Sequence, residues 1–469
     1  MNKPEKIVSP DLSEALTYPV DAFVSREYAE AEAEKLWPKV WQQAGRVEEL
    51  KAVGDFITYN ICHDSILIVR DTPSSLKAYH NVCPHRGRRL VGNNTGGGPA
   101  PVKQNTGNHS AKGSQMKFGC AYHAWTFDLD GDATYIPDKE DWNGALDKVC
   151  TSLTPVQVDT WGGWIWINMD PDAGPLRDFL EPIASIIDPF EFEKMRYRFR
   201  FWGIFDCNWK VALEAFLEPY HVQGTHPQLI KYGDFYSFSK SFGLHGQTGF
   251  DSKAHRDSGT AVETSVHRAA GDGDPRTTIA QMQAEYWETI GASTSETLVK
   301  TAQRLPLELP EGTPAADVHK HWMKIAQEED AARGVTWPAL TDAQVAAAGL
   351  ALSVFPNVNF IPGPTFALSY RVRPYGTDPD KCIFEAVALD RFGEGQEPET
   401  EWTYVEQDLD KWPYVISQDI SNMVEVQLGY KSRGFRGNLP NPWQERKVTN
   451  LHYNLAKFMD GVGAPKRVD

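Results

Sequence analysis

Two histidines stand five positions apart among carboxylates in one short stretch of the chain. His221 and His226 follow Glu218, and Gly224 lies between them. On an ideal helix, residues five apart point about 140° away from each other. The two imidazoles can therefore converge on one ion only if the helix ends between them, and Gly224 followed by Pro227 supplies such an end. The pair predicts a non-haem iron site that lacks one ligand, and two hydrogen-bonded, half-buried histidines are the alternative.

The residues before this pair have helical spacing with two distinct faces. Phe216 and Leu217 can bury one side of the helix. Glu214, Glu218 and His221 follow one another at i, i+4 and i+7, so they share another side. The spacing predicts two carboxylates on the same side as the first histidine.

A second set of metal-binding residue types lies nearer the N-terminus. Cys83 and His85 have the spacing C-x-H, and Cys120 and His123 have the spacing C-x-x-H. Two thiolates on one iron and two imidazoles on the other are what a [2Fe–2S] cluster of the Rieske kind requires. A structural zinc site has the same ligand count. Zinc modules usually pair like ligands in each loop, whereas both loops here are mixed, so the spacing favours the iron–sulfur cluster.

The segments around the cysteine loops have the short, alternating, β-branched pattern of strands. We expect a small all-β module over residues 40–171, with strands at 55–61, 65–70, 76–82, 116–119, 125–129 and 161–168. Residues 92–117, between the two loops, are rich in Gly, Asn, Pro and Ser and predict an exposed, mobile insertion. We assign His109, in this insertion, to the surface.

The remaining residues, 172–469, mix helical and strand-like patterns. Helices are expected at 176–187, 278–304 and 315–333; strands of an antiparallel sheet at 197–205, 354–361, 365–374 and 382–388; residues 235–275 are polar and irregular. A last helix covers 416–427 and places Asp419 beside its apolar face. Asp419 is either a first-turn acid favoured by the helix dipole or a third ligand, which would complete a triad of two histidines and one carboxylate.

Composition limits the classes of function. The 469 residues are 41% hydrophobic with 15 Trp, which is typical of a globular chain of two or three domains. A net charge of −16 argues against nucleic-acid binding. With no membrane-length apolar run and no hydrophobic signal region, we expect a cytoplasmic protein. Six cysteines in so long a chain do not form a disulfide framework.

Both ligand sets, in this order, resemble the large (α) subunit of Rieske non-haem iron ring-hydroxylating oxygenases, over most of the chain. The resemblance rests on the two cysteine loops, Asn208-Trp209-Lys210, Tyr220-His221, His226 and the Gln418-Asp419…Val426-Gln427 helix. It implies Cys83, His85, Cys120 and His123 as cluster ligands. It implies His221, His226 and Asp419 as ligands of a mononuclear iron.

The resemblance gives Glu218 the role of an electron bridge. In the family an aspartate three residues before the first iron histidine links it to a cluster histidine of a neighbouring subunit, and here the acid is one methylene longer. Two further departures are Glu214 or Ala215 where many members have an asparagine, and the long insertion at 92–117. The implied fold is α+β: a Rieske domain over 40–171 and a helix-grip catalytic domain over 172–469, with residues 1–39 packed on the latter.

The implied activity is that of a terminal oxygenase component using NAD(P)H-derived electrons and O2. The substrate would be an aromatic or other cyclic compound, cis-dihydroxylated or monohydroxylated in aromatic hydrocarbon catabolism. The alternatives are an O- or N-demethylating monooxygenase and a Rieske electron-transfer protein without oxygen chemistry. The expected partners are a ferredoxin or reductase, docked on Arg86, Arg88 and Arg89, and an α3 or α3β3 assembly with a small β subunit. Phe216 and Phe355 are expected in the substrate pocket.

Overall fold

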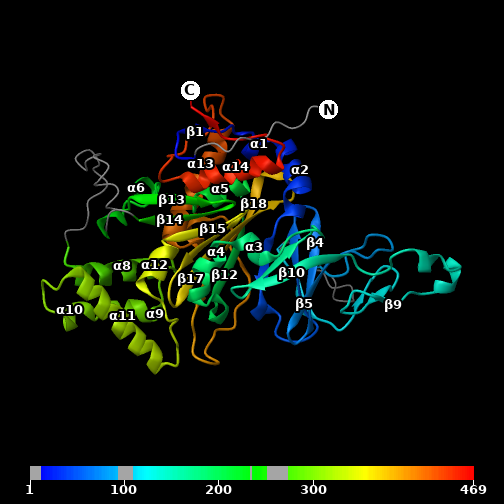
Figure 1. The fold of residues 1–469 in the computed structure, drawn as a ribbon, viewed down its shortest axis with the longest axis horizontal. Coiled ribbons are helices and arrows are strands. Elements are labelled where there is room, and N and C mark those ends of the chain that lie inside the picture. The colour runs from blue at the N-terminus through cyan, green and yellow to red at the C-terminus, as the bar shows by residue number, and fades with distance from the viewer. Residues whose placement is uncertain (1–11, 93–108, 233–234, 251–272, 469) are drawn as a thin grey trace. The chain divides into compact units, whose positions relative to one another are not determined.

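The computed structural model describes residues 12–92, 109–232, 235–250 and 273–468 (Figure 1). The chain forms two compact units. The small unit is Ala31–Phe179, and the large unit is Leu180 onward together with the N-terminal residues up to Glu30.

The small unit is built from β-strands, because its sequence alternates apolar and polar residues in short runs bounded by turns. A seven-stranded sheet has the order β2-β11-β10-β5-β4-β3-β6, and a three-stranded sheet has the order β7-β8-β9. The strands are β2 (Gln42–Arg46), β3 (Asp55–Ile61), β4 (Asp64–Thr72), β5 (Ser75–His80), β6 (Lys112–Ser114), β7 (Phe118–Gly119), β8 (Thr126–Phe127), β9 (Ala133–Tyr135), β10 (Pro155–Trp161) and β11 (Trp164–Asn168).

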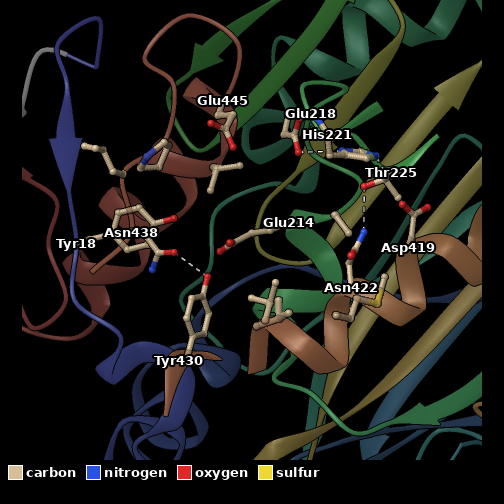
Figure 2. A pocket seen from close by; sticks show the side chains of 17 residues that line it. Tyr18, Glu214, Glu218, His221, Thr225, Asp419, Asn422, Tyr430, Asn438 and Glu445 are labelled. Atoms are coloured by element: carbon tan, nitrogen blue, oxygen red, sulfur yellow. Dashed lines mark hydrogen bonds and ion pairs between the residues drawn. The ribbon is translucent and has the colours of Figure 1, made fainter. Parts of the chain in front are cut away.

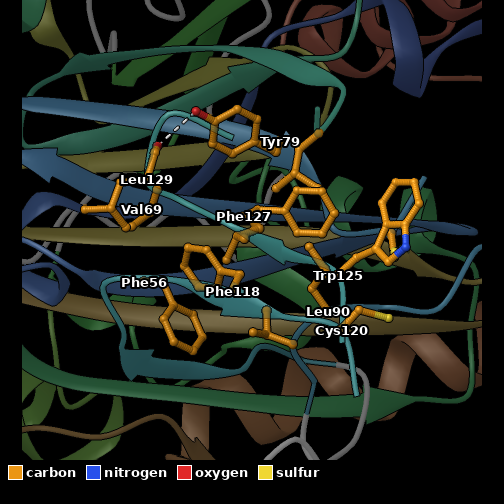
Figure 3. Close-up of a cluster of buried hydrophobic side chains, with 13 residues drawn as sticks. Phe56, Val69, Tyr79, Leu90, Phe118, Cys120, Trp125, Phe127 and Leu129 are labelled. Carbon is orange, nitrogen blue, oxygen red and sulfur yellow. Dashed lines mark hydrogen bonds between the residues drawn. The ribbon is translucent and has the colours of Figure 1, made fainter. Parts of the chain in front are cut away.

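Aromatic side chains fill the core between the cysteine loops and the neighbouring strands (Figure 3). Phe118 and Phe127 are 1% and 0% exposed, and Phe56 meets Phe118 edge-on with ring centroids 5.5 Å apart. Cys83 and Cys120 belong to the same buried cluster. The packing of these rings therefore fixes where both cysteines lie.

The prediction of a surface position for His109 is wrong, because its side chain is 4% exposed. Strand β6 follows directly and pairs with β3, which draws the end of the insertion onto the sheet. His109 Nδ1 lies 3.2 Å from Ser110 Oγ. Residues 93–108 of the expected mobile insertion lie outside the described residues.

The large unit is organised on an eight-stranded sheet with the order β13-β14-β15-β16-β17-β18-β12-β19. Its strands are antiparallel except for the short parallel pair β12–β19. They are β12 (Arg196–Phe205), β13 (Ser237–Phe242), β14 (His245–Phe250), β15 (Ala351–Val354), β16 (Val358–Pro362), β17 (Phe366–Tyr375), β18 (Asp378–Asp390) and β19 (Thr403–Tyr404). The terminal strands β1 (Leu16–Thr17) and β20 (Lys466–Arg467) pair separately.

Helices of the large unit pack on this sheet and on one another. Helix α5 packs on β17 and β18, α14 on β13 and β14, and α13 on α5. Helices α8 to α12 gather at one end of the unit (Figure 1). The helices are α1 (Asp21–Val24), α4 (Ile183–Ile187), α5 (Trp209–Glu214), α6 (Val222–Thr225), α8 (Pro275–Thr289), α9 (Glu296–Ala302), α10 (Leu305–Glu308), α11 (Ala315–Ala332), α12 (Asp342–Ala348), α13 (Tyr414–Tyr430) and α14 (Arg446–Phe458). A small all-β unit and an antiparallel sheet with helices confirm the α+β fold class.

The expectation of irregular structure from residue 235 onward is wrong for the segment up to Phe250, which forms the β13–β14 hairpin. The strand period is hidden because polar side chains face inward. Ser239 is 3% exposed, and its hydroxyl accepts a hydrogen bond from the Lys447 backbone N–H of α14 at 2.8 Å. Residues 251–272 of that stretch lie outside the described residues.

None of the helices in the described part of the chain has both the length and the apolar character needed to cross a membrane.

Truncating the centre of the aromatic core should destabilise the protein strongly. Phe127 is fully buried, and Phe→Ala changes at such sites cost about 3–5 kcal/mol because they remove apolar contacts and leave a cavity. We expect Phe127→Ala to lower the midpoint of guanidinium unfolding accordingly. Tyr135→Ala is the control, because that side chain is 57% exposed. Equal midpoints for the two variants would contradict this account of the core.

Candidate metal centres

The two cysteine loops of the small unit have the same local backbone shape. In each loop the cysteine carbonyl accepts a hydrogen bond from the backbone N–H four residues later. Cys83 accepts from Gly87 at 3.0 Å, and Cys120 accepts from Ala124 at 2.8 Å. Both donors have positive φ, +72° and +60°. The tight turn brings each histidine back over its cysteine, so four possible ligands converge from two loops.

These four side chains fit an iron–sulfur cluster with two kinds of ligand. Cys83 and Cys120 are buried, while His85 and His123 are half-buried, with ring centroids 4.6 Å apart. His85 stacks on Trp125 at 5.0 Å, which holds its plane. The Nδ1 atom of His123 is buried without a hydrogen-bond partner among the described residues. Burial also lowers the pKa of His123, which favours the neutral imidazole that metal ligation needs.

In the large unit, the backbone between Glu214 and His226 is broken twice. Helix α5 ends at Glu214, and the short helix α6 begins after His221 and ends at Thr225. His221 therefore precedes α6 and His226 follows it. The predicted helix end between the two histidines is confirmed, and the helical spacing expected before it is divided between two short helices.

Both imidazoles turn the same ring atom toward one carboxylate. His226 Nε2 lies 3.0 Å and His221 Nε2 lies 3.6 Å from the same oxygen, Asp419 Oδ1. His221, His226 and Asp419 each offer one possible ligand atom, and these three atoms all lie within 4.8 Å of one another. Two imidazole nitrogens and one carboxylate oxygen at this spacing could hold a single iron ion and leave coordination positions open.

The other ring nitrogen of each histidine is already engaged. Glu218 Oε1 lies 2.9 Å from His221 Nδ1, and Gln418 Oε1 lies 2.9 Å from His226 Nδ1. Such contacts fix the tautomer and plane of metal-ligating histidines. Burial lowers the pKa of His221, but the charges of Glu218 and Asp419 outweigh it and raise the pKa to about 9. The two carboxylates thus favour positive charge at this position, which is what a metal ion would supply.

Asn208 and Gln427 hold the helices that carry these groups. Asn208 caps α5 by accepting from the Lys210 N–H at 3.1 Å, and its amide donates to the carbonyls of Phe23 and Pro379. The Asn208 N–H donates to Gln427 Oε1 on α13 at 3.0 Å. Since Gln427 is two turns beyond Asp419 on α13, this pairing sets α13 against the start of α5.

A polar cavity of about 440 Å³ opens on one side of the site (Figure 2). Glu214, Glu218 and Glu445 face it together with His221 and Asp419. Burial, and next the charge of Glu218, raise the pKa of Glu445 to about 7. Beyond this cavity, Glu214 Oε1 lies 2.5 Å from Nε2 of the buried His452. We call this space the acidic cavity.

An apolar cavity of about 300 Å³ lies on the other side. We call it the apolar cavity; its lining shares Ala215, Glu218, His221 and Asp419 with the acidic cavity. The described residues that line it include no Lys or Arg. Its aromatic members are Phe216, Phe235, Phe250, Tyr286, Phe366 and Tyr370. The candidate iron site therefore borders two spaces, one lined by additional carboxylates and the other by aromatic rings.

The structure separates the two phenylalanines expected in the substrate pocket. Phe216 lines the apolar cavity and stacks on Tyr370 with centroids 4.0 Å apart. Phe355 lies elsewhere and stacks on Phe458 of α14 at 5.8 Å. It follows the end of β15, whose first residue, Ala351, is the one that reaches the apolar cavity.

Two features of the site were not predicted from the sequence: Gln418 as the partner of His226, and Tyr370 as part of the cavity wall. The neighbouring position of Gln418 and Asp419 on one helix turn was the available signal for the first. Arg86, Arg88 and Arg89 are exposed on the small unit, and the Arg86 guanidinium lies 5.3 Å from the ring centre of Tyr122.

Comparison with known proteins gives two family matches. Residues 190–461, more than half of the chain, match the ring hydroxylating alpha subunit (catalytic domain), and residues 40–154 match the Rieske [2Fe-2S] domain. The chain belongs to the ring-hydroxylating α-subunit family of Rieske non-haem iron oxygenases. A [2Fe–2S] cluster and a mononuclear iron are the cofactors of these two domains.

Among curated relatives, the glycine betaine monooxygenase oxygenase subunit of Pseudomonas aeruginosa is 29% identical over 217 residues, 46% of either chain. The carnitine monooxygenase oxygenase subunit of Acinetobacter pittii is 32% identical over 221 residues, 47% of this chain and 54% of that protein. The chain thus spans about half the length of the curated relatives it matches.

Solved structures share the fold. A quaternary ammonium Rieske monooxygenase in complex with L-carnitine has a TM-score of 0.61 at 20% identity, covering 96% of this chain and 97% of that one. Naphthalene 1,2-dioxygenase with indole bound has a TM-score of 0.62 at 18% identity, covering 98% and 96%.

Removing the Asn208 side chain should loosen the junction of α5 and α13. Asn208→Ala loses a helix cap and two buried amide donors, so we expect a loss of about 2–3 kcal/mol in the free energy of unfolding. Ser295→Ala is the control, because Ser295 caps α9 by accepting from the Leu298 N–H and supplies a cap alone. Equal losses in the two variants, measured by denaturant unfolding, would show that the amide donors of Asn208 contribute nothing.

Proposed function

We propose that the chain is the terminal oxygenase component of a Rieske-type system that inserts oxygen into an organic substrate. The observation that carries this proposal is the convergence of His221, His226 and Asp419 between the acidic and apolar cavities. One cavity can admit substrate while the other faces the source of electrons. The catalytic-domain match over residues 190–461 argues against an electron carrier without oxygen chemistry.

We assign Cys83, His85, Cys120 and His123 as ligands of the [2Fe–2S] cluster. His221, His226 and Asp419 are assigned to the mononuclear iron. When bound, the cluster stores single electrons and the iron binds and reduces dioxygen. The residues of each site fit this use. The cluster site has two buried thiols and two imidazoles, and the mononuclear iron site has two imidazoles and one carboxylate.

Glu218 is assigned the role of the electron bridge. Its carboxylate accepts from the His221 backbone N–H at 3.0 Å as well as from its ring, so it is fixed to the iron ligand at two points. It also lines the acidic cavity, from which a second protein surface can reach it. The longer glutamate side chain is thus compatible with the position that an aspartate takes in the family.

For a monooxygenase, one oxygen atom enters a C–H bond of the substrate and the other leaves as water, with two electrons and two protons consumed. We place the substrate in the apolar cavity, where six aromatic rings exclude water from the reacting carbon. His221 and Asp419 form the wall at which oxygen must arrive.

The substrate class that we favour is an N-methylated organic cation, oxidised at a carbon bonded to nitrogen. Aromatic faces and the carboxylates of Glu218 and Asp419 attract an ammonium group, and the matched relatives are monooxygenases named for glycine betaine and carnitine. Hydroxylation of a ring is the second candidate, supported by the aromatic lining. Oxygen uptake stimulated by N-methylated cations supports the first class; stimulation by neutral rings alone assigns the second.

The partners we propose are a ferredoxin or reductase and further copies of this chain. The exposed Arg86, Arg88 and Arg89 offer positive charge on an otherwise acidic protein, which suits an acidic electron donor. A trimer, α3 or α3β3, would let the cluster of one copy supply the iron of the next.

Loss of the carboxylate ligand should remove one metal ion and leave the other site intact. We expect Asp419→Ala to hold about two irons and two acid-labile sulfides per chain, against about three irons in the wild type. Glu425→Ala, on the exposed face of the same helix, should keep all three. Iron retained in full by Asp419→Ala, measured by elemental analysis, would contradict this ligand set.

Removing the charge of Glu218 should slow electron transfer without emptying the iron site. In Glu218→Gln we expect iron content to be kept while oxidation of the reduced cluster, in a single turnover with O2 and substrate, slows by about tenfold or more. Glu214→Gln provides the control, because Glu214 lines the same acidic cavity but contacts His452 instead of His221. Equal slowing in both variants would assign the effect to cavity charge and not to a bridge.

A further inference from the structure

Tyr370 has an unusual position in the wall of the apolar cavity. It lies in the middle of β17, paired with Asn359 of β16 and Ala386 of β18. Its side chain is 3% exposed, yet it lines the cavity that also reaches His226 and Asp419. A phenol is thus built into the wall of the cavity that also contains the candidate iron ligands.

Two neighbouring rings hold the Tyr370 ring in one orientation. Phe216 stacks on it with centroids 4.0 Å apart and planes at 24°, and Phe384 lies 5.7 Å away at 32°. Phe216 and Phe384 in turn contact each other at 5.4 Å. Because three rings support one another, the hydroxyl of Tyr370 cannot swing to a new partner without disturbing the wall.

The hydroxyl of Tyr370 has no hydrogen-bond partner among the residues that the structure describes. Tyr370 lines the apolar cavity, and its hydroxyl is not one of the fully enclosed unpaired polar atoms, so a molecule in the cavity can reach it. Tyrosines in apolar surroundings usually find a partner for this group. Burial, with the charge of Asp419 adding to it, raises the pKa of Tyr370 well above its ordinary value. The group is therefore a neutral donor at physiological pH, in a cavity whose lining includes Asp419.

We propose that Tyr370 is a specificity-determining residue whose hydroxyl donates a hydrogen bond to an oxygen atom of the substrate. This inference rests on the proposed function, because it takes the apolar cavity to be the substrate site. The substrate class is narrowed to molecules with an apolar or cationic body that carry an acceptor oxygen, such as a carbonyl or hydroxyl, close to the carbon that is oxidised. A rigid donor of this kind orients that carbon toward His226 and Asp419, and it disfavours analogues without the oxygen.

A pair of isosteric probes isolates this hydrogen bond. Acetophenone and α-methylstyrene have the same shape, and differ in a carbonyl oxygen against a methylene group. Their dissociation constants would be measured by calorimetry on the iron-loaded protein without oxygen, for wild type and for Tyr370→Phe. We expect the preference for acetophenone over α-methylstyrene to fall about fivefold in Tyr370→Phe, the scale of one neutral hydrogen bond.

Two further tyrosine variants serve as matched controls. Tyr375→Phe makes the same change at the end of the same strand, and Tyr375 is absent from the cavity lining. Tyr286→Phe makes it on α8, at another tyrosine of the cavity lining. Neither should alter the preference. A loss of preference in Tyr286→Phe but not in Tyr370→Phe, or an equal preference in wild type and Tyr370→Phe, would overturn the proposal.

The stability of the ligand-free protein tests, even if neither probe binds, whether the Tyr370 hydroxyl has a partner within the protein. Removing an unpaired hydroxyl should leave the Tm of Tyr370→Phe unchanged or slightly raised. A fall of more than about 2 °C would show that the hydroxyl has a protein partner, which overturns the proposal. Iron content and oxygen uptake are followed in parallel, because their loss in the wild type would refute the oxygenase assignment and not the role of Tyr370.

Discussion

The contact of one carboxylate with two imidazoles is the interaction on which the large unit depends. Asp419 Oδ1 is shared between His221 and His226, and each imidazole reaches it with Nε2 only because Nδ1 is held elsewhere. This arrangement needs two segments far apart in the chain, around His221–His226 and Gln418–Asp419, to meet within a few ångströms. Helix α13 supplies Gln418 and Asp419 from one turn, and the pairing of Asn208 with Gln427 sets that helix against α5. Asp419 lies near the start of α13 and Gln427 near its end, so the contact of Gln427 with Asn208 also fixes the position of Asp419.

The two cavities beside this centre differ in their lining residues, so the two sides of the centre suit different kinds of molecule. Carboxylates of Glu214, Glu218 and Glu445 face the acidic cavity, whereas aromatic rings line the apolar one. Charge attracts a basic protein surface and stays hydrated; rings exclude water and hold an organic molecule. Glu218 and Asp419 are both members of the two linings, and Glu218 is also bonded to Nδ1 of His221, so it can couple events on the two sides. The candidate cluster site in the small unit also has two different sides. Rings such as Phe118 and Phe127 pack around the buried cysteines, while the histidines are half-buried and nearer the surface.

The residues that carry chemistry could be predicted from sequence because their types and spacings are rare together. Each motif alone has another explanation: the C-x-H and C-x-x-H loops could bind zinc, and the His221–His226 pair could be hydrogen-bonded histidines. The combination of all three in one chain is rare, so together they indicate the two iron sites. Features that depend on tertiary packing could not be predicted. The β13–β14 hairpin is hidden because its inward residues, such as Ser239, are polar and bond to α14. His109 is buried by a strand pairing that no local pattern reveals, and Phe355 packs on Phe458, which comes a hundred residues later. Glu218 was expected near the iron ligand, but its second contact, to the His221 backbone, follows from the break between α5 and α6.

The most direct test of the two-centre assignment is the iron and acid-labile sulfide content of the wild-type protein, purified without oxygen, with an EPR spectrum after dithionite reduction. The account predicts about three irons and two sulfides per chain and the low-average-g signal of a reduced cluster with mixed thiolate and imidazole ligands. Two irons and two sulfides, with no third iron taken up from added iron(II) and no oxygen uptake, would contradict the oxygenase assignment. Zinc without sulfide would contradict both centres.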